Sequence, residues 1–357
     1  MTAPTGTAEA AWATVVGQAE AVSALRSWAL DPVHAYLFVG PSGTGKRQAA
    51  RAFSAAVQSQ HFVGDEAGRE RQLQLALADK HPDVEIYEPQ GSQLLVGDVE
   101  VIIPSVFRKP ADGPRRIIVI DRFHDANDAS AAALLKTVEE PPANAIIILL
   151  AESVPHEHVA IASRCARIDF PPLSHADLAG WIQAQGIGTD QIEMLIEASA
   201  GDLRRLELLT NDAGFGERAE LWRSLPTSID GTGATAGRLV RELTALVAAA
   251  AEPLVARHAN ELEELDAREE MLGTRGSGRS GVDARHKREL RRLRTGELNF
   301  GLRMLARRYR MALSEGGGAE IVAAIDRLRE ANEALVRNPN ETLLLHNLFW
   351  NLPALPR

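Results

Sequence analysis

The sequence of 357 residues contains a single cysteine, Cys165. One cysteine excludes a disulfide within the chain and a zinc site built from several cysteines, and it favours a reducing compartment. The sequence also lacks an apolar run long enough to span a bilayer, and its first residues lack the basic start and apolar core of a secretion signal. We therefore expect a cytoplasmic protein with no membrane segment and no bound zinc.

An excess of positive charge is missing as well. The net charge is −9 and charged residues make up 24% of the chain. This balance argues against a protein that coats nucleic acid with its whole surface, although it is compatible with a local basic face. The length exceeds what one hydrophobic core ordinarily supports, so two or three domains are expected.

The most informative stretch is YLFVGPSGTGK, from Tyr36 to Lys46. An apolar strand that runs into a glycine loop and then a helix is typical of a phosphate cradle. Glycines let successive backbone amides converge on an anion, and Lys46 adds a positive charge at the start of the helix. The glycines of this loop are Gly40, Gly43 and Gly45.

Apolar segments farther along the chain predict more strands of the same sheet. Residues 117–120 form a short β-branched run that ends at Asp121, and residues 144–150 form another. Helical periodicity separates these segments, and strands that alternate with helices predict a doubly wound parallel sheet. Ligands of such sheets bind at the carboxyl ends of the strands, so Asp121 is expected to face a ligand.

From residue 174 onward the pattern is helical. Residues 273–281, GTRGSGRSG, have the composition of a flexible linker. This linker separates an acidic stretch at residues 261–270 from a basic one at residues 285–294. We expect these two helices of opposite charge to pair as a hairpin, and DNA contact by the basic helix is the alternative.

Several motifs occur in the order found in the bacterial clamp-loader ATPases of the AAA+ family, which the chain resembles over about residues 12–210. The motifs are Val15–Gln18, the phosphate loop, His81–Asp83, the strand ending at Asp121, LLKTVEEPP at residues 134–142 and Ser-Arg-Cys at residues 163–165. The resemblance implies an α/β P-loop (AAA+) module with a parallel sheet at residues 1–172. A helical lid at residues 173–211 and an all-α C-terminal collar domain at residues 212–357 would follow, with a flexible insertion near residues 273–281.

The resemblance also implies roles for single residues. Arg164 matches the arginine finger that a subunit presents to the nucleotide of its neighbour, and Arg204 matches the lid arginine called sensor 2. The polar sensor 1 position falls at Glu152 or Ser153. Residues implied for nucleotide contact are Val16, Gly17, Gly40, Gly43, Gly45, Lys46, Arg47, Asp121 and Arg204.

The chain departs from the family at two positions that matter for hydrolysis. Arg47 replaces the serine or threonine that places a hydroxyl on Mg²⁺, and Arg122 replaces the acid that polarises the attacking water. Losing either kind of group raises the barrier by several kcal/mol, so we expect that the chain is not an effective ATPase by itself. Whether the loop binds ATP is an open question. The glycines and Lys46 favour binding, whereas such a loop can also be retained only because it packs the strand against the helix.

The implied function is to help load a ring-shaped sliding clamp onto primed DNA, as a subunit of the DNA polymerase III holoenzyme. The implied partners are the gamma or tau ATPase subunits, the delta subunit, the sliding clamp and primed DNA. One alternative is a self-sufficient AAA+ ATPase that acts on nucleic acid, against which Arg47 and Arg122 argue. Another is a nucleotide-sensing scaffold, which does not account for the Ser-Arg-Cys triplet.

Overall fold

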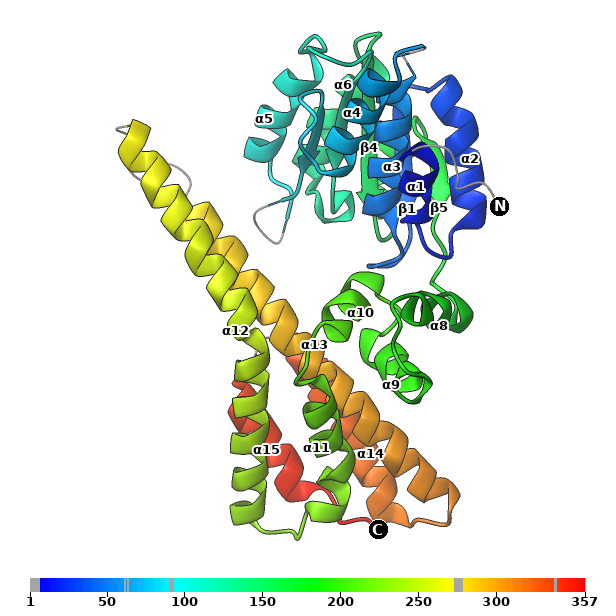
Figure 1. Ribbon diagram of the computed structural model, residues 1–357. Coiled ribbons are helices and arrows are strands. Elements are labelled where there is room, and N and C mark those ends of the chain that lie inside the picture. The colour runs from blue at the N-terminus through cyan, green and yellow to red at the C-terminus, as the bar shows by residue number, and fades with distance from the viewer. Residues whose placement is uncertain are drawn as a thin grey trace. The chain divides into compact units, whose positions relative to one another are not determined.

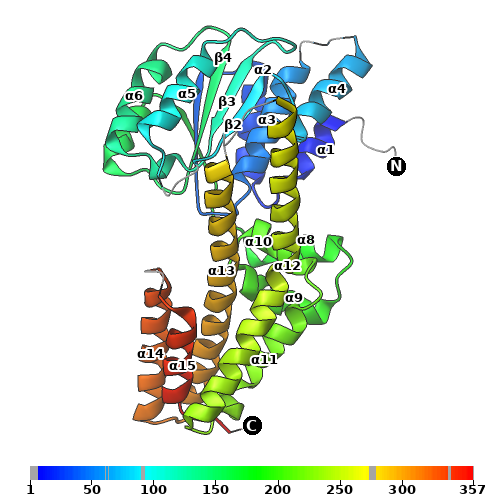
Figure 2. The same ribbon diagram turned by 90° about the vertical axis from the view of Figure 1, so that its left-hand side faces the viewer.

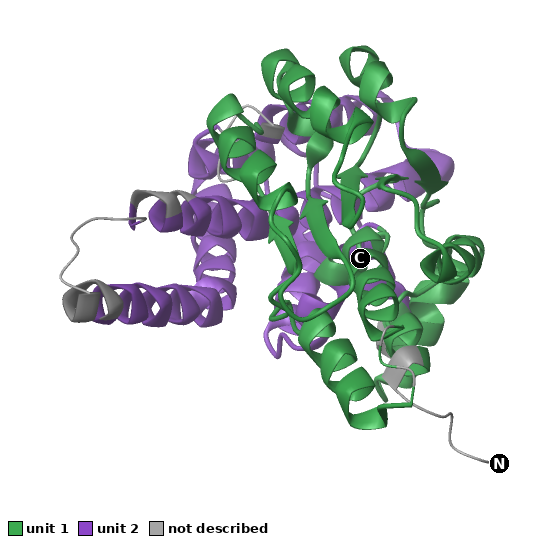
Figure 3. Ribbon diagram, turned by 90° about the horizontal axis from the view of Figure 1, so that it is seen from above, with its two compact units in different colours: residues 1–192, 201–205 green, residues 193–200, 206–357 purple. Residues whose placement is uncertain are grey.

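The structure, a computed structural model, describes residues 7–60, 62, 64–89, 93–272, 279–336 and 339–356. The chain divides into two compact units: unit 1 comprises residues 1–192 and 201–205, and unit 2 comprises residues 193–200 and 206–357 (Figure 3). The expected three-domain division stays a prediction. Most of the expected flexible insertion, residues 273–278, lies outside the described residues.

Unit 1 is built on a five-stranded parallel sheet with strand order β2-β3-β4-β1-β5 (Figure 1). The strands are β1 (Ala35–Val39), β2 (Val84–Tyr87), β3 (Arg116–Ile120), β4 (Ala145–Ala151) and β5 (Ala166–Asp169). Every residue of β1, β3 and β4 is buried, as continuous apolar strands require when helices cover both faces. The predicted parallel α/β module is therefore confirmed.

Two hydrophobic cores lie on the opposite faces of this sheet. Successive residues of a strand point to opposite faces, so Phe38 of β1 packs into one core with Phe53, while Leu37 packs into the other with Leu134. The helices of this part are α1 (Thr7–Ala13), α2 (Ala19–Leu30), α3 (Lys46–Ser59), α4 (Glu66–Leu77), α5 (Val96–Val106), α6 (Asp128–Glu139) and α7 (Val159–Ala162). Short 3₁₀ turns occupy Phe123–Asp125 and His156–His158.

The rest of the chain is helical where it is described, as predicted. Its helices are α8 (His175–Ala184), α9 (Thr189–Ser199), α10 (Leu203–Thr210), α11 (Phe215–Ser228), α12 (Gly233–Leu272), α13 (Arg279–Ser314), α14 (Ala319–Val336) and α15 (Glu341–Asn351). Within the described ranges, no helix combines the length and the apolar character that a membrane crossing needs.

The helices α12 and α13 run antiparallel and side by side in unit 2 (Figures 1 and 2). Glu261 of α12 pairs with Arg285 and accepts a hydrogen bond of 2.9 Å from His286 of α13. Glu289 of α13 is 2.8 Å from the ring nitrogen Nε2 of His258 in α12, and the two histidine rings stack with centroids 3.8 Å apart. The predicted hairpin of oppositely charged helices is therefore confirmed.

A buried arginine joins α11 to α13. Arg218 is 2% exposed, donates to Glu297 at 2.8 Å and to Asp212 at 3.2 Å, and lies over the ring of Phe215. Its two carboxylate partners compensate the loss of hydration, and they keep the pKa of Arg218 above its ordinary value against the effect of burial. Removing either partner would leave the buried guanidinium with a single carboxylate.

The same two helices also meet where Trp222 of α11 packs on Gly301 of α13. Trp222 is fully buried, and a Cβ added at Gly301 would lie 1.9 Å from its atom Cε2. Only a residue without a side chain fits at this position of α13.

Gly301→Ala is therefore expected to lower the free energy of unfolding by about 1–3 kcal/mol through overpacking. Gly216→Ala in α11 is the matched control, because a Cβ there meets nothing within 4 Å. The control should leave the stability unchanged or raise it by up to about 1 kcal/mol. Urea unfolding followed by tryptophan fluorescence measures both variants, and equal stability of the two would contradict this packing.

Candidate functional site

The loop predicted to cradle phosphate joins β1 to α3. Gly43 and Gly45 have positive φ angles of 71° and 89°, which residues with a Cβ rarely adopt. A Cβ at Gly40 would lie 2.0 Å from the carbonyl oxygen of Phe170. The three glycines are thus required by the backbone and its packing, whether or not the loop holds an anion.

Lys46, the first residue of α3, is 9% exposed. Its Nζ donates hydrogen bonds to the carbonyl oxygens of Gly40 (2.5 Å) and Pro41 (2.6 Å). Burial lowers the pKa of Lys46, and the nearby carboxylates of Glu152 and Asp121 oppose this shift. Because the ammonium already has partners within its own loop, an entering phosphate would compete with them.

Arg47 lies among three carboxylates. Its Nη1 is 3.2 Å from Glu88 and 3.5 Å from Asp121, and its Nη2 is 3.9 Å from Asp79. Asp121 follows directly after β3, at the carboxyl end of the sheet where we expected a ligand-facing acid. A fixed guanidinium beside this acid supplies the positive charge that a metal ion would otherwise bring, and it repels a second cation.

Arg122 stands at the position where the family resemblance implies an acid that polarises water. Its φ angle is 53°, and its Nε donates to Asp125 Oδ2 at 2.8 Å. Its backbone N–H donates to the carboxylate of Asp121 at 2.8 Å. Asp125, the next acid along the chain, is therefore engaged by Arg122.

The Val15–Gln18 motif, in which Val16 and Gly17 are implied for nucleotide contact, lies beside the loop. A Cβ added at Gly45 would lie 3.7 Å from Val15 Cγ1. Val16 is half-buried, and Gly17 has a positive φ angle of 67° with the carboxylate of Asp177 close to it. The structure thus brings Val15 next to the loop, and the implied nucleotide contacts of Val16 and Gly17 stay a prediction.

Asp202 lies beside the loop, a contact that the sequence did not predict. Ser42 Oγ donates to its carboxylate at 3.1 Å, and a Cβ at Gly43 would lie 2.1 Å from that carboxylate. The N–H of Leu203 donates to the carbonyl of Gly43, so the start of α10 packs on the loop. Arg204, the expected sensor 2 residue, is exposed on the first turn of α10. A carboxylate therefore lies beside the candidate phosphate cradle.

Arg164, the expected finger, lies between α7 and β5 with 40% of its side chain exposed. Its Nη1 donates to the carbonyl of Ala160 at 2.7 Å, and its Nε pairs with Glu139 at the end of α6. Glu139 belongs to the LLKTVEEPP motif, so two separate motifs meet at this arginine. Burial raises the pKa of the adjacent Cys165 thiol to about 12, which makes it a poor nucleophile near neutral pH.

The structure does not decide whether Glu152 or Ser153 is the sensor 1 residue. Glu152 and Ser153 follow β4 directly and are both exposed. The backbone N–H of Glu152 donates to His124 Nδ1 at 3.2 Å.

Comparison with known proteins identifies a matching family model and several relatives. Residues 18–174 match the family model described as DNA polymerase III, delta subunit. Over 195 residues the chain is 33% identical to DNA polymerase III subunit tau of Bacillus subtilis, covering 53% of this chain and 34% of that protein. Over 170 residues it is 29% identical to DNA polymerase III subunit delta' of Pseudomonas aeruginosa, covering 47% of this chain and 52% of that protein.

The chain thus spans about a third to a half of these relatives. Among solved structures, a DNA polymerase III gamma subunit-related protein from Thermotoga maritima shares 18% identity with a TM-score of 0.48. That comparison covers 92% of this chain and 96% of that protein. The sequence matches confirm the predicted resemblance to the subunits of bacterial clamp loaders.

The variant Arg47→Met tests whether the guanidinium stabilises the three carboxylates and keeps Mg²⁺ away from them. The variant leaves Asp79, Glu88 and Asp121 without this shared cation, so we expect a loss of about 1 kcal/mol in the free energy of unfolding. Millimolar Mg²⁺ should raise the melting temperature of this variant more than that of the wild type, because the ion can then approach the carboxylates.

Arg51→Met is the control, since Arg51 lies one turn farther along α3 and hydrogen bonds to Asp79. It should gain no comparable response to Mg²⁺. An identical Mg²⁺ response of the wild type and both variants would contradict the role given to Arg47.

Proposed function

We propose, from the match of residues 18–174 to the DNA polymerase III delta-subunit family, that this chain is the delta-prime subunit of a bacterial clamp loader. In this role it works in the cytoplasm with the gamma or tau ATPase subunits and the delta subunit, and it helps to load the sliding clamp onto primed DNA. Similarity to both a tau and a delta' protein supports the assignment to the complex. The arginines at positions 47 and 122 favour the subunit that does not hydrolyse ATP.

The proposal assigns no ATP turnover to the phosphate loop of this chain. Phosphoryl transfer to water needs a metal ion on the phosphates and an oriented water. The ion pair between Arg47 and Asp121 opposes the first requirement, and the engagement of Asp125 by Arg122 opposes the second. The loop then serves as a rigid turn between β1 and α3, with or without a bound nucleotide.

The contribution of this chain to catalysis is Arg164, acting on the nucleotide of a neighbouring subunit. The observation that carries this step is the exposed guanidinium, which Glu139 holds through Nε and the carbonyl of Ala160 holds through Nη1. A finger must reach beyond its own subunit, and anchoring limits the side-chain entropy lost when it docks. Its planar fork of donors suits the charge that develops on the γ-phosphate.

Arg164→Ala should leave the chain folded but lower ATP hydrolysis by the reconstituted complex with clamp and primed DNA present. The adjacent ATPase site is expected to lose about a thousandfold in rate, so the complex loses the share of turnover that this site supplies. Arg164→Lys should be nearly as defective, because an ammonium lacks the planar fork.

Arg167→Ala is the matched control, because Arg167 is also exposed and pairs with a carboxylate, that of Asp169. It should keep wild-type turnover. Wild-type turnover by an intact Arg164→Ala complex would overturn the proposed finger.

A further inference from the structure

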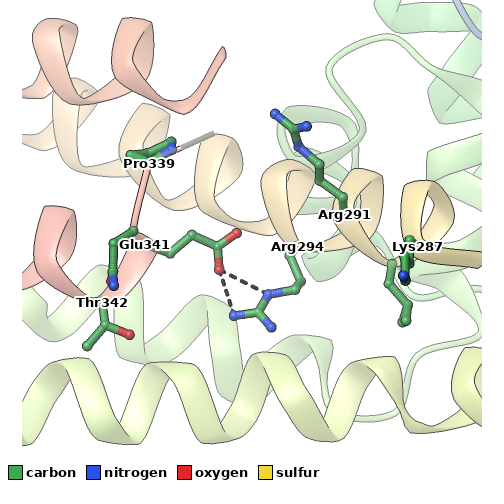
Figure 4. A pocket seen from close by; sticks show the side chains of 8 residues that line it. Lys287, Arg291, Arg294, Pro339, Glu341 and Thr342 are labelled. Carbon is green, nitrogen blue, oxygen red and sulfur yellow. Dashed lines mark hydrogen bonds and ion pairs between the residues drawn. The ribbon is translucent and has the colours of Figure 1, made fainter. Parts of the chain in front are cut away.

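Unit 2 contains an open hollow of about 430 Å³ between α13 and the start of α15 (Figure 4). Six of its eight lining residues are polar or charged, and the side chains used below are Lys287, Arg291, Arg294, Glu341 and Thr342. The hollow lies on a basic helix of a chain whose net charge is −9. It is therefore a local concentration of positive charge on an acidic protein.

Three cations follow one face of α13. Lys287, Arg291 and Arg294 are spaced by four and three residues, which places them on the same side of a helix. They span roughly 10 Å along the helix axis. One strand of duplex DNA carries a phosphate about every 3.4 Å along its axis, so this span matches about three of these steps between phosphates.

Two of these cations have no counter-ion of their own. Across the described ranges of the chain, neither Lys287 nor Arg291 makes an ion pair or a hydrogen bond through its side chain, and both are exposed. By contrast, Arg285 on the same helix is paired with Glu261 in the hairpin. The pairing of α12 with α13 therefore uses the basic residues of one side and leaves these two available.

The third cation is held by a carboxylate inside the hollow. Arg294 donates to Glu341 through Nε at 3.0 Å and is 2.7 Å from it through Nη2, as the dashed lines in Figure 4 show. Glu341 is the first residue of α15, and Thr342 beside it carries a hydroxyl of the kind that often contacts phosphate. Releasing Arg294 from Glu341 would add a third cation to the face.

We propose that Lys287, Arg291 and Arg294 form a binding face for the phosphate backbone of DNA, independent of base sequence. The choice of DNA rests on the proposed function, because a clamp loader works on primed DNA. Contacts to phosphates position a protein on the nucleic acid without reading its sequence. With two free cations and one held by Glu341, the face binds DNA with a shallow salt dependence.

The test is a titration of primed DNA, labelled with fluorescein, with the full chain at several salt concentrations, read by fluorescence anisotropy. Arg291→Ala and Lys287→Ala should each weaken binding about tenfold. Each should also lower the slope of log K against log salt concentration by about 1. Arg310→Ala is the matched control, because Arg310 is exposed on the same helix and lies outside the hollow.

A second pair of variants tests whether the ion pair with Glu341 keeps Arg294 from binding DNA. Glu341→Gln should tighten DNA binding several-fold, because it frees Arg294 and removes a carboxylate from the face. Glu333→Gln changes the charge equally at an exposed glutamate of α14 that pairs with Arg329, and it should have no such effect. Circular dichroism checks that the variants remain folded.

Two outcomes would contradict the proposal that this face binds DNA. Equal weakening by Arg291→Ala and Arg310→Ala would reduce the effect to net charge. Unchanged DNA binding together with weaker assembly with the partner ATPase subunits would assign the face to an acidic protein surface instead. Because the titration uses the isolated chain, its failure is distinct from failure of the finger, which only the assembled complex reports.

Discussion

The ion pair between Arg47 and Asp121, 3.5 Å apart, sets the charge beside the phosphate loop of unit 1. Arg47 comes from the first turn of α3 and Asp121 from the end of β3, and both lie at the carboxyl edge of the parallel sheet. An ATPase of this architecture needs a divalent cation between such an acid and the phosphates. A fixed guanidinium beside the acid makes that cation unnecessary for charge balance and unfavourable to bind.

The conformation of the loop is supported by contacts of its glycines with other parts of unit 1. Gly40 lies against the carbonyl of Phe170, and Gly43 lies against Asp202. Lys46 is satisfied by carbonyls of the same loop. The shape of the loop therefore does not depend on a bound nucleotide. On the surface of the same unit, Arg164 pairs with Glu139 with 40% of its side chain exposed, and we propose that it serves a partner subunit.

Much of this arrangement was predictable from local patterns in the sequence. Each of these patterns can be recognised within a short contiguous segment. They are the buried runs of β1, β3 and β4, the glycine loop, and the acidic segment of α12 and the basic segment of α13. The contacts of Arg164 with Glu139 and of Gly43 with Asp202 were not predictable, because each joins segments that only the tertiary fold brings together. The same holds for Arg47, since Asp79, Glu88 and Asp121 come from three separate segments. Local periodicity also left the choice between Glu152 and Ser153 open, because both residues follow β4 in exposed positions.

The central claim is that this chain serves the active site of a neighbour and does not use its own. The most direct measurement is ATP turnover by the assembled complex, with clamp and primed DNA present, when this chain carries Lys46→Ala. We expect turnover per assembled complex to stay within about twofold of the wild type, since an unused site contributes nothing to the rate. A large loss of turnover in a complex that still assembles would show that the loop of this chain hydrolyses ATP, and it would contradict the claim.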